Sequence, residues 1–306
     1  MKGEGAGTSR ERGRKEGNDE RDAAPMLPRV SCRRGSTLVR QLIGIRAMAK
    51  GRPGSTKAAA AGSPARKRAR KQEVDEDLAV PPQNWERVLG LVKDWRAAGP
   101  SAPVDTMGCE RLQDPNADAK TQRFHTLVSL MLSSQTKDQV TAAAMERLHA
   151  MGLTVQNVAD KFSEEEIDEA ICKVGFHTTK AKRIKEAARI LIEKHDGDIP
   201  DTADGLMALP GVGPKMAFIC MNVAWGKPSG IGVDVHVHRI TNRIGWCNDT
   251  PNPEKTRARL EAWLPVDEWI DINPLLVGFG QLLCTPRAPK CRDCPLADGL
   301  CKSAEI

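Results

Sequence analysis

Lys215 and Asp234 are the two residues whose side chains could perform covalent chemistry together. Lys215 is the only charged residue in the apolar stretch 215–224, and it stands where a helix would begin. Burial and the helix dipole both favour its neutral amine, which is the nucleophilic form. Asp234 could steer the proton of such an amine and stabilise positive charge that develops nearby. Each residue also has an ordinary interpretation, a solvent-reaching lysine and a helix N-cap.

The residues before Lys215 predict a helix, a glycine turn and a second helix. The first helix covers 203–208, and Gly211 and Gly213 are expected to reach positive φ in a tight turn. Pro214 suits the first position of the second helix, where its missing N–H costs nothing. Free N–H groups at this turn form an anion site, so Gly211, Val212 and Gly213 are candidate phosphate contacts.

Four cysteines, Cys284, Cys291, Cys294 and Cys301, fall in a proline-rich stretch near the C-terminus. Four thiolates can bind a tetrahedral zinc ion or a [4Fe–4S] cluster. A zinc ribbon uses two C-x-x-C pairs, whereas one such pair with two wider gaps fits the cluster better. The other five of the nine cysteines are scattered. Without a secretory signal, a disulfide framework is not expected.

The formal net charge of +6 is unevenly distributed. Residues 1–77 carry 19 basic and 10 acidic residues, whereas residues 78–306 carry 27 and 30. The charge of the folded part therefore predicts no nucleic-acid binding unless basic residues cluster on one face. Arg287, Lys290 and Arg292 lie among the C-terminal cysteines, and we expect them to contact a second phosphate.

From Pro81 onward, apolar residues recur at helical spacing and no convincing alternating strand is found, so the predicted fold class is all-α. Two capping boxes are predicted, Thr136 with Gln139 and Ser163 with Glu166. The expected helices cover residues 84–98, 121–132, 138–151, 163–175, 179–194, 203–208, 215–224, 235–246, 253–264 and 267–283, with a loop at 99–116.

Residues 1–80 are predicted to be a disordered, basic targeting tail. The run 66–71 is a nuclear-localisation type of basic cluster. Residues 23–72 contain no acidic residue and interleave arginines with serine and aliphatic residues, as organelle transit peptides do. Acidic residues before Ala23 do not fit a transit peptide, so a start at Met26 is expected to give an organelle-targeted form. No apolar run approaches the roughly 20 residues that a membrane span needs, so no membrane partner is expected.

Three features together resemble the endonuclease III family of DNA repair glycosylases: the run 209–215 (Leu-Pro-Gly-Val-Gly-Pro-Lys), Val233 with Asp234, and the four C-terminal cysteines. The resemblance covers Pro81 to Cys301 and is nearest to the eukaryotic endonuclease III-like proteins. It implies the helix–hairpin–helix DNA glycosylase fold, with two helical domains and an iron–sulfur cluster loop. The implied domains are a helical barrel, residues 116–228, and a discontinuous cluster domain, residues 81–115 and 229–306.

The same resemblance assigns Lys215 as the nucleophilic amine, Asp234 as its activating carboxylate and Gln135 as the residue that fills the gap in the duplex. It implies a [4Fe–4S] cluster on the four cysteines, damaged double-stranded DNA as partner, a monomer, and a nuclear protein with a mitochondrial form. Its tail is then available for contacts with other repair proteins. The implied activity removes oxidised pyrimidines through a lysine Schiff base and cuts the strand by β-elimination.

The chain departs from the family pattern at Val235, where threonine is usual, and in the last cysteine gap, which is one residue longer than expected. Other functions stay open. Adenine-mismatch glycosylases share the hairpin and the cysteines but lack the lysine, and 8-oxoguanine glycosylases lack the cysteines. A non-catalytic DNA-binding protein with a cluster is the third alternative. His236 and His238 are interpreted as structural or, at most, as DNA contacts.

Overall fold

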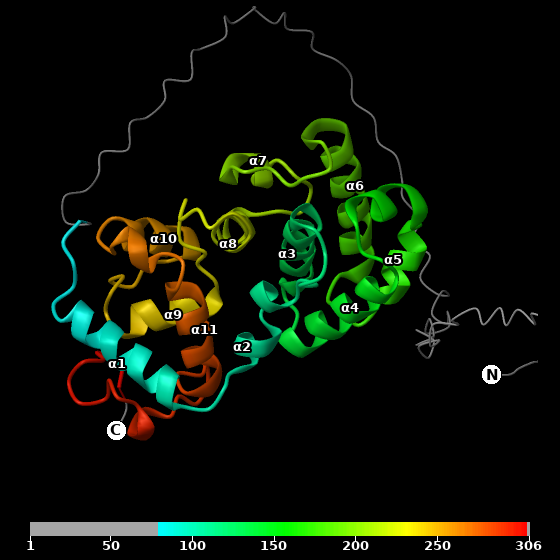
Figure 1. The fold of residues 1–306 in the computed structure, drawn as a ribbon. Coiled ribbons are helices and arrows are strands. Elements are labelled where there is room, and N and C mark those ends of the chain that lie inside the picture. The colour runs from blue at the N-terminus through cyan, green and yellow to red at the C-terminus, as the bar shows by residue number, and fades with distance from the viewer. Residues whose placement is uncertain (1–78, 305–306) are drawn as a thin grey trace, which may run out of the picture. The chain divides into compact units, whose positions relative to one another are not determined.

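A computed structural model describes residues 79–304 of the chain. Within this range the chain is helical and contains no strand, which confirms the all-α prediction for the described residues (Figure 1). No helix in residues 79–304 is long and apolar enough to cross a membrane. The targeting tail predicted for residues 1–80 falls almost wholly outside the described residues. The α-helices are α1 (Trp85–Ala98), α2 (Pro103–Met107), α3 (Ala119–Ser133), α4 (Asp138–Ala150), α5 (Glu164–Ala170), α6 (His177–His195), α7 (Ala203–Met207), α8 (Pro214–Trp225), α9 (Val235–Arg243), α10 (Pro253–Glu261) and α11 (Ile272–Leu282).

Buried apolar side chains form two large clusters. One extends from Phe124 to Met221 and draws on α3–α8, and the other combines α1 with residues from Ile231 to Leu296. The short helix α2 contacts both α4 and α11 and so links the two groups of helices. The clusters draw on the residues that the sequence assigns to two helical domains, whose boundaries stay a prediction. Apolar burial of this extent is the main stabilising term of such a fold.

Side-chain capping sets the start of α5 but not that of α4, so one of the two predicted boxes is confirmed. The Ser163 hydroxyl accepts from Glu166 N (3.1 Å), and the Glu166 carboxylate accepts from Ser163 N (2.8 Å). The box predicted at Thr136 is wrong, because the N-cap of α4 is Lys137 and makes no side-chain cap. The Thr136 hydroxyl donates instead to the carbonyl of Ser134 (3.1 Å). That hydroxyl is therefore part of the loop and not of the helix start.

Proline explains one of the two largest errors in the helix boundaries. The helix predicted over 267–283 begins only at Ile272, which puts Pro274 into its first turn. A proline deeper in the helix would remove a hydrogen bond and collide with the preceding turn. Residues 99–116, expected to be a loop, contain α2 and a 3₁₀ turn at Cys109–Arg111. The helices α5, α9 and α10 end several residues before their predicted ends.

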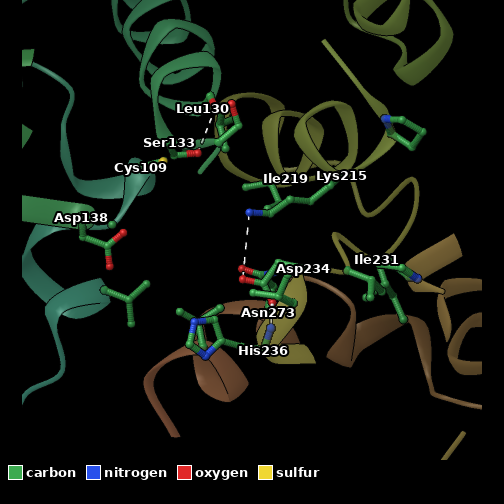
Figure 2. A pocket seen from close by; sticks show the side chains of 18 of the residues that line it. Cys109, Leu130, Ser133, Asp138, Lys215, Ile219, Ile231, Asp234, His236 and Asn273 are labelled. Carbon is green, nitrogen blue, oxygen red and sulfur yellow. Dashed lines mark hydrogen bonds and ion pairs between the residues drawn. The ribbon is translucent and has the colours of Figure 1, made fainter. Parts of the chain in front are cut away.

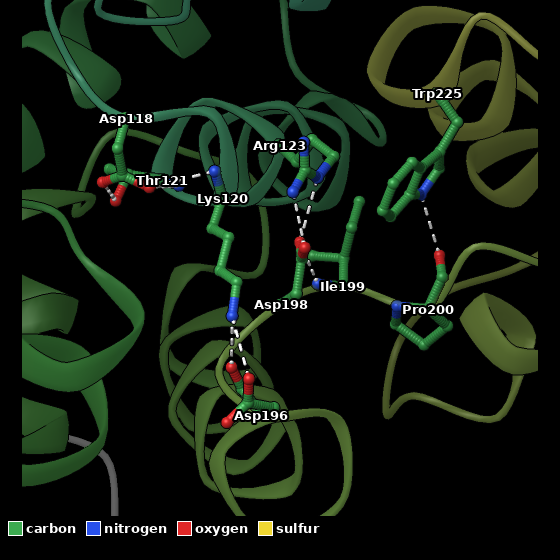
Figure 3. A network of polar contacts seen from close by, with 9 residues as sticks. All are labelled: Asp118, Lys120, Thr121, Arg123, Asp196, Asp198, Ile199, Pro200 and Trp225. Carbon is green, nitrogen blue, oxygen red and sulfur yellow. Dashed lines mark hydrogen bonds and ion pairs between the residues drawn. The ribbon is translucent and has the colours of Figure 1, made fainter.

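Polar contacts fix the start of α3 against the segment that follows α6 (Figure 3). Asp118 caps the helix by accepting from the backbone N–H of Lys120 (3.0 Å). The Lys120 ammonium pairs with Asp196 (3.0 Å), and the Arg123 guanidinium makes a two-pronged contact with Asp198, of which the Nε–Oδ1 arm measures 3.0 Å. Bidentate arginine–carboxylate pairs fix orientation as well as distance. They set the direction of α3, whose other end leads into the loop that carries Gln135.

Candidate active site

The side chains of Lys215 and Asp234 face each other across the space between α8 and α9 (Figure 2). Lys215 Nζ lies 4.0 Å from Asp234 Oδ2, and the two side chains are 39% and 12% exposed. The other carboxylate oxygen of Asp234 accepts from the N–H groups of His236 and Val237, both at 2.8 Å. Asp234 is therefore both the N-cap of α9 and the carboxylate nearest to the amine. The N-cap interpretation of this residue is confirmed, whereas its catalytic role stays a prediction.

The segment that leads into Asp234 packs closely against α8 on one side and is hydrogen-bonded to α11 on the other. A Cβ on Gly232 would collide with Ile219 of α8, and a Cβ on Gly230 would lie 2.5 Å from Phe218. The carbonyl of Gly232 accepts from Asn273 Nδ2 of α11 (2.5 Å). Glycine is required at such close backbone approaches. The spacing between the amine and the carboxylate is thus set by two helices on either side of one extended segment.

The pair opens into a cleft of about 790 Å³, within the range of pockets that enclose small ligands. Gln135 and Asp138 line the cleft from the α3–α4 loop and the start of α4, and His236 lines it from α9. Asp138 Oδ2 accepts from Gln281 Nε2 (2.7 Å), and Gln281 Oε1 in turn accepts from the N–H of Val104 (3.1 Å). Asp138 and Gln281 belong to no recognised motif, so the sequence did not point to them.

The two histidines of α9 have different surroundings. Burial lowers the pKa of His236 although the charge of Asp234 opposes this, so His236 is a neutral ring at neutral pH. His238 Nδ1 lies 2.7 Å from the Thr256 hydroxyl and joins α9 to α10. His238 is thus a packing residue, as interpreted from the sequence, whereas His236 lies where a ligand in the cleft would touch it.

Gln135 adopts the left-handed backbone conformation, with φ of 52°. This conformation is uncommon outside glycine and persists only when surrounding contacts hold it. Its side chain lines the cleft around Lys215 and also a neighbouring cavity that contains Phe176, Arg183 and Gly211. Gln135 is therefore a turn residue whose side chain also lines the cleft, and its contact with DNA stays a prediction.

The glycine turn before α8 differs from the prediction at one residue. Gly211 has φ of +84°, whereas Gly213 has φ of −104° as the N-cap of α8, so the expected positive φ of Gly213 is wrong. Val212 is 8% exposed and its N–H donates to the carbonyl of Leu209 (3.2 Å). Within residues 79–304, the N–H groups of Gly211, Gly213 and Lys215 donate no backbone hydrogen bond. They, and not Val212, are the groups that remain for an anion.

Two residues near this turn, Phe176 and Arg183, were not among the site residues predicted from the sequence. Phe176 is 66% exposed and has a left-handed backbone, with φ of 59°. The aliphatic part of Arg183 lies directly over Gly211, where Arg183 Cδ would be 2.6 Å from a Cβ. The exposure of Phe176 and the contact of Arg183 with Gly211 appear only in the folded chain, so no sequence pattern pointed to these two residues.

The four C-terminal thiols line one small pocket together with Arg243. Burial, reinforced by the three neighbouring cysteines, raises the pKa of Cys294 to about 11. Arg243 Nη1 donates to Cys284 Sγ (3.3 Å), and the Cys301 thiol donates to the carbonyl of Arg243 (3.5 Å). Among the described residues no group of three or more His, Cys, Asp or Glu side chains is arranged to hold a single metal ion. The four thiols share this pocket, and the group that they hold stays a prediction.

Arg287, Lys290 and Arg292 are exposed on the loop between these cysteines. None of them forms a salt bridge with an acidic residue inside the range 79–304. Their position at the surface is what a phosphate contact requires, and their role stays a prediction.

Comparison with known proteins identifies the family. Residues 128–266 match the model of the HhH-GPD superfamily base excision DNA repair proteins. Endonuclease III-like protein 1 of Bos taurus is 50% identical over 233 residues, which are 75% of this chain and 75% of the bovine chain. The endonuclease III homolog of Schizosaccharomyces pombe is 49% identical over 235 residues, covering 76% of this chain and 65% of the yeast protein. Endonuclease III homolog 1, chloroplastic, of Arabidopsis thaliana is 45% identical over 253 residues, which are 79% of this chain and 66% of the plant protein. This chain therefore spans just under two thirds of the length of the Schizosaccharomyces pombe and Arabidopsis thaliana proteins.

Solved structures agree with the relatives. A trapped endonuclease III–DNA covalent intermediate matches with a TM-score of 0.61 at 27% identity, covering 72% of this chain and 96% of that chain. A non-covalent endonuclease III–DNA complex matches with a TM-score of 0.61 at 29% identity, covering 72% and 95%. From its sequence relatives and its helical fold together, the chain belongs to the endonuclease III family of helix–hairpin–helix base excision DNA repair proteins.

Proposed function

We propose that the chain is a DNA glycosylase with AP lyase activity, which removes oxidised pyrimidines from duplex DNA. The observation that carries the proposal is the lysine–carboxylate pair, with Lys215 Nζ 4.0 Å from Asp234 Oδ2 in a cleft of about 790 Å³. An amine, a carboxylate and a cavity of nucleotide size are what Schiff-base chemistry on a deoxyribose needs. A base must first leave the stack to reach them, at a cost of a few kcal/mol that is least for a damaged pair.

The neutral amine of Lys215 attacks C1′ of the sugar, and the bond between C1′ and the base breaks. The departing base takes the bonding electrons and then a proton. Asp234 stabilises the positive charge that builds on the sugar and accepts a proton from the attached amine. The sugar ring opens to a protonated imine, C2′ loses a proton, and the 3′ phosphate leaves by β-elimination. Water then releases Lys215 from the sugar fragment.

The surface around the cleft supplies contacts for a DNA backbone. The unengaged N–H groups at Gly211 and Gly213 stand at the N-terminus of α8, where an anion is favoured. Phe176 is exposed beside the cavity that Gln135 lines, where an apolar side chain could separate two base steps. In this proposal Gln135 occupies the space that the extruded nucleotide leaves, and Arg183 contacts a phosphate next to the hairpin.

We further propose that Cys284, Cys291, Cys294 and Cys301 hold a [4Fe–4S] cluster. Their thiols line a common pocket, and one C-x-x-C pair between two wider gaps fits a four-iron cluster better than the paired C-x-x-C knuckles of a zinc ribbon. A four-iron cluster is larger and accepts thiolates that stand farther apart. Such a cluster cross-links the C-terminal loop when bound, and Arg243 Nη1 then donates a hydrogen bond to one of its ligands.

For the tail, we propose targeting to the nucleus and, from an internal start at Met26, to mitochondria. The composition of residues 1–80 supports this proposal, because basic clusters and acid-free segments are typical of such signals. Fluorescent fusions that begin at Met1 and at Met26 should distribute differently in cells. Identical distributions of the two fusions would refute the internal start.

Borohydride trapping tests the catalytic proposal. Full-length protein is incubated with a duplex that contains thymine glycol, and borohydride reduces any imine to a stable covalent adduct. Wild type and Lys227→Gln should form the adduct, because Lys227 is paired with Asp201 at the far end of α8 (3.0 Å). Lys215→Gln should form none while still binding the duplex. An adduct of normal yield with Lys215→Gln would refute the assignment, and binding without any wild-type reaction would favour a non-catalytic DNA-binding protein.

Metal analysis tests the cluster. We expect four iron atoms and four sulfides per chain, with absorbance at about 400 nm from thiolate-to-iron charge transfer. Cys294→Ser should lose both iron and absorbance. One zinc per chain and no sulfide, in protein purified without oxygen, would contradict the proposal.

A further inference from the structure

A buried lysine of α6 holds the loop that carries Gln135. Lys180 is 6% exposed, and its ammonium donates to the carbonyls of Leu132 and Ser134, both at 2.7 Å. Its third contact is the hydroxyl of Thr136, at 3.3 Å. An ammonium has three N–H donors, so each finds an acceptor within the five residues 132–136.

Within residues 79–304, the hydrogen bonds to the Lys180 ammonium come from this loop. Among the described residues Lys180 forms no salt bridge with a carboxylate, and burial lowers its pKa to about 8. The acceptors at Leu132 and Ser134 stand at the C-terminus of α3, where the helix dipole favours a cation. A buried charge is tolerated only when its hydrogen bonds are complete. The loop and the ammonium therefore hold each other in place.

The conformation held in this way is an unfavourable one. Gln135 has φ of 52°, and its carbonyl lies 2.9 Å from the position that a Cβ on Gly175 would take. The N–H of Gly175 donates to the Thr136 hydroxyl (3.3 Å), so the start of α6 contacts the loop from a second direction. A left-handed glutamine costs free energy that neighbouring contacts must offset. Without them, Gln135 would relax away from the cleft.

We propose that Lys180 is a positioning residue, which keeps the 132–136 loop in the one conformation that presents Gln135 to the cleft. The proposal rests on the proposed function, because it assumes that Gln135 enters the gap in the duplex. Lys180 touches neither the DNA nor the reacting atoms in this account and acts only through Gln135. Its removal should weaken the recognition of a vacated site in the duplex before it affects the covalent step at Lys215.

The same helix offers a matched control. Lys185 is 7% exposed, and its ammonium donates to the carbonyls of Val158 (3.3 Å), Ala159 (3.4 Å) and Phe162. It therefore binds the C-terminal end of a short π-helical turn, Asn157–Lys161, as Lys180 binds the end of α3. None of these three carbonyl-bearing residues lines the cleft. Replacing Lys185 removes a buried lysine of the same kind without touching the Gln135 loop.

The experiment is a double-mutant cycle with full-length protein. The variants are Lys180→Met, Lys185→Met, Gln135→Ala and the pair Lys180→Met with Gln135→Ala. The probe is a duplex in which 2-aminopurine stands opposite a tetrahydrofuran abasic-site analogue, whose fluorescence changes when a side chain enters the gap. Affinity for this duplex and for an intact one is measured at a temperature where all variants are folded. Single-turnover trapping on the thymine glycol duplex is measured in parallel.

Lys180→Met and Gln135→Ala should each lose most of the fluorescence change and prefer the abasic-site duplex about 3- to 30-fold less than wild type. In the Gln135→Ala background, Lys180→Met should cause no further loss, and Lys185→Met should keep the wild-type preference. Equal effects of Lys180→Met with and without Gln135 would overturn the proposal, as would equal effects of the two lysine variants. Failure of wild type to trap DNA while this pattern holds would count against the proposed activity alone.

If Lys180→Met does not fold, Thr136→Val replaces it in the cycle. This change removes one acceptor of Lys180 and the acceptor of Gly175 N while keeping the charge hydrogen-bonded to two carbonyls. It should cause a smaller loss of the same preference, which disappears in the Gln135→Ala background. A loss that persists without Gln135 would again overturn the proposal.

Discussion

The two oxygens of Asp234 perform separate tasks, so replacing this residue with asparagine separates folding from chemistry. Asparagine and aspartate are equally good N-caps, and the side-chain oxygen of the asparagine in Asp234→Asn would still accept from the N–H groups of His236 and Val237. The free energy of unfolding of Asp234→Asn should therefore fall by less than about 1 kcal/mol. Asp234→Ala leaves both N–H groups without their acceptor and should cost about 1–2 kcal/mol.

The effect of Asp234→Asn on the reaction follows from the distance between Lys215 Nζ and Asp234 Oδ2. Two unit charges 4.0 Å apart interact by about 1 kcal/mol in water and about 4 kcal/mol at an effective dielectric constant near 20. Because the Lys215 side chain is 39% exposed, the interaction energy of the pair before the reaction lies toward the lower of these two values. Losing the proton acceptor as well costs about 100-fold or more in rate. Single-turnover base release should thus be at least about 100-fold slower in both variants.

Urea denaturation and single-turnover kinetics, measured on the same preparations, test the separation. Asp234→Asn should be nearly as stable as wild type and nearly as slow as Asp234→Ala. A base-release rate within threefold of wild type for Asp234→Asn would refute the role of the charge. A loss of stability equal to that of Asp234→Ala would refute the capping argument.

Three further predictions address other parts of the site. Gly211→Ala should lower the free energy of unfolding by about 1–2 kcal/mol because φ is +84°. Gly213→Ala has open space around its Cβ and should cost less than about 1 kcal/mol, the usual loss when alanine replaces a better N-cap. Equal urea midpoints of the two variants would contradict this. Phe176→Ala should leave the stability within about 0.5 kcal/mol, since the ring is 66% exposed, but weaken binding to an abasic-site duplex in fluorescence anisotropy; unchanged binding would contradict the wedge. The pKa of Lys180 is about 8 in the folded chain against about 10.4 when unfolded. Between these values only the unfolded chain holds the proton, so the stability of wild type relative to Lys180→Met should rise with pH, and parallel curves would contradict the buried charge.

Structure could be predicted best from the sequence where the contacts are local. The Ser163 box is confirmed because its partners stand three residues apart in the chain. The box at Thr136 had the same local pattern but failed, since the hydroxyl also meets the ammonium of Lys180, 44 residues away. A local pattern shows which groups a side chain can bind, but contacts with distant segments determine which of these groups it does bind. The glycine turn, Lys215 and Asp234 were predictable because their spacing is a motif of the family.

Residues that act across the fold were not predictable in this way. Lys180 stands four residues before Ile184, on the apolar side of α6, but only the packing of α3 against α6 shows that its ammonium is buried against the 132–136 loop. Asp138 and Gln281 are separated by 143 residues and meet through the contacts of α2 with α4 and α11. Helical periodicity tells which side of a helix is buried, but not which helix covers it.

Peptide mapping of the borohydride-reduced adduct tests the central claim most directly. Full-length protein is reacted with the thymine glycol duplex, digested, and analysed by mass spectrometry for the lysine that carries the reduced deoxyribose fragment. The account predicts a single modified residue, Lys215. A fragment attached to another lysine or to the N-terminal amine, with Lys215 unmodified, would contradict it.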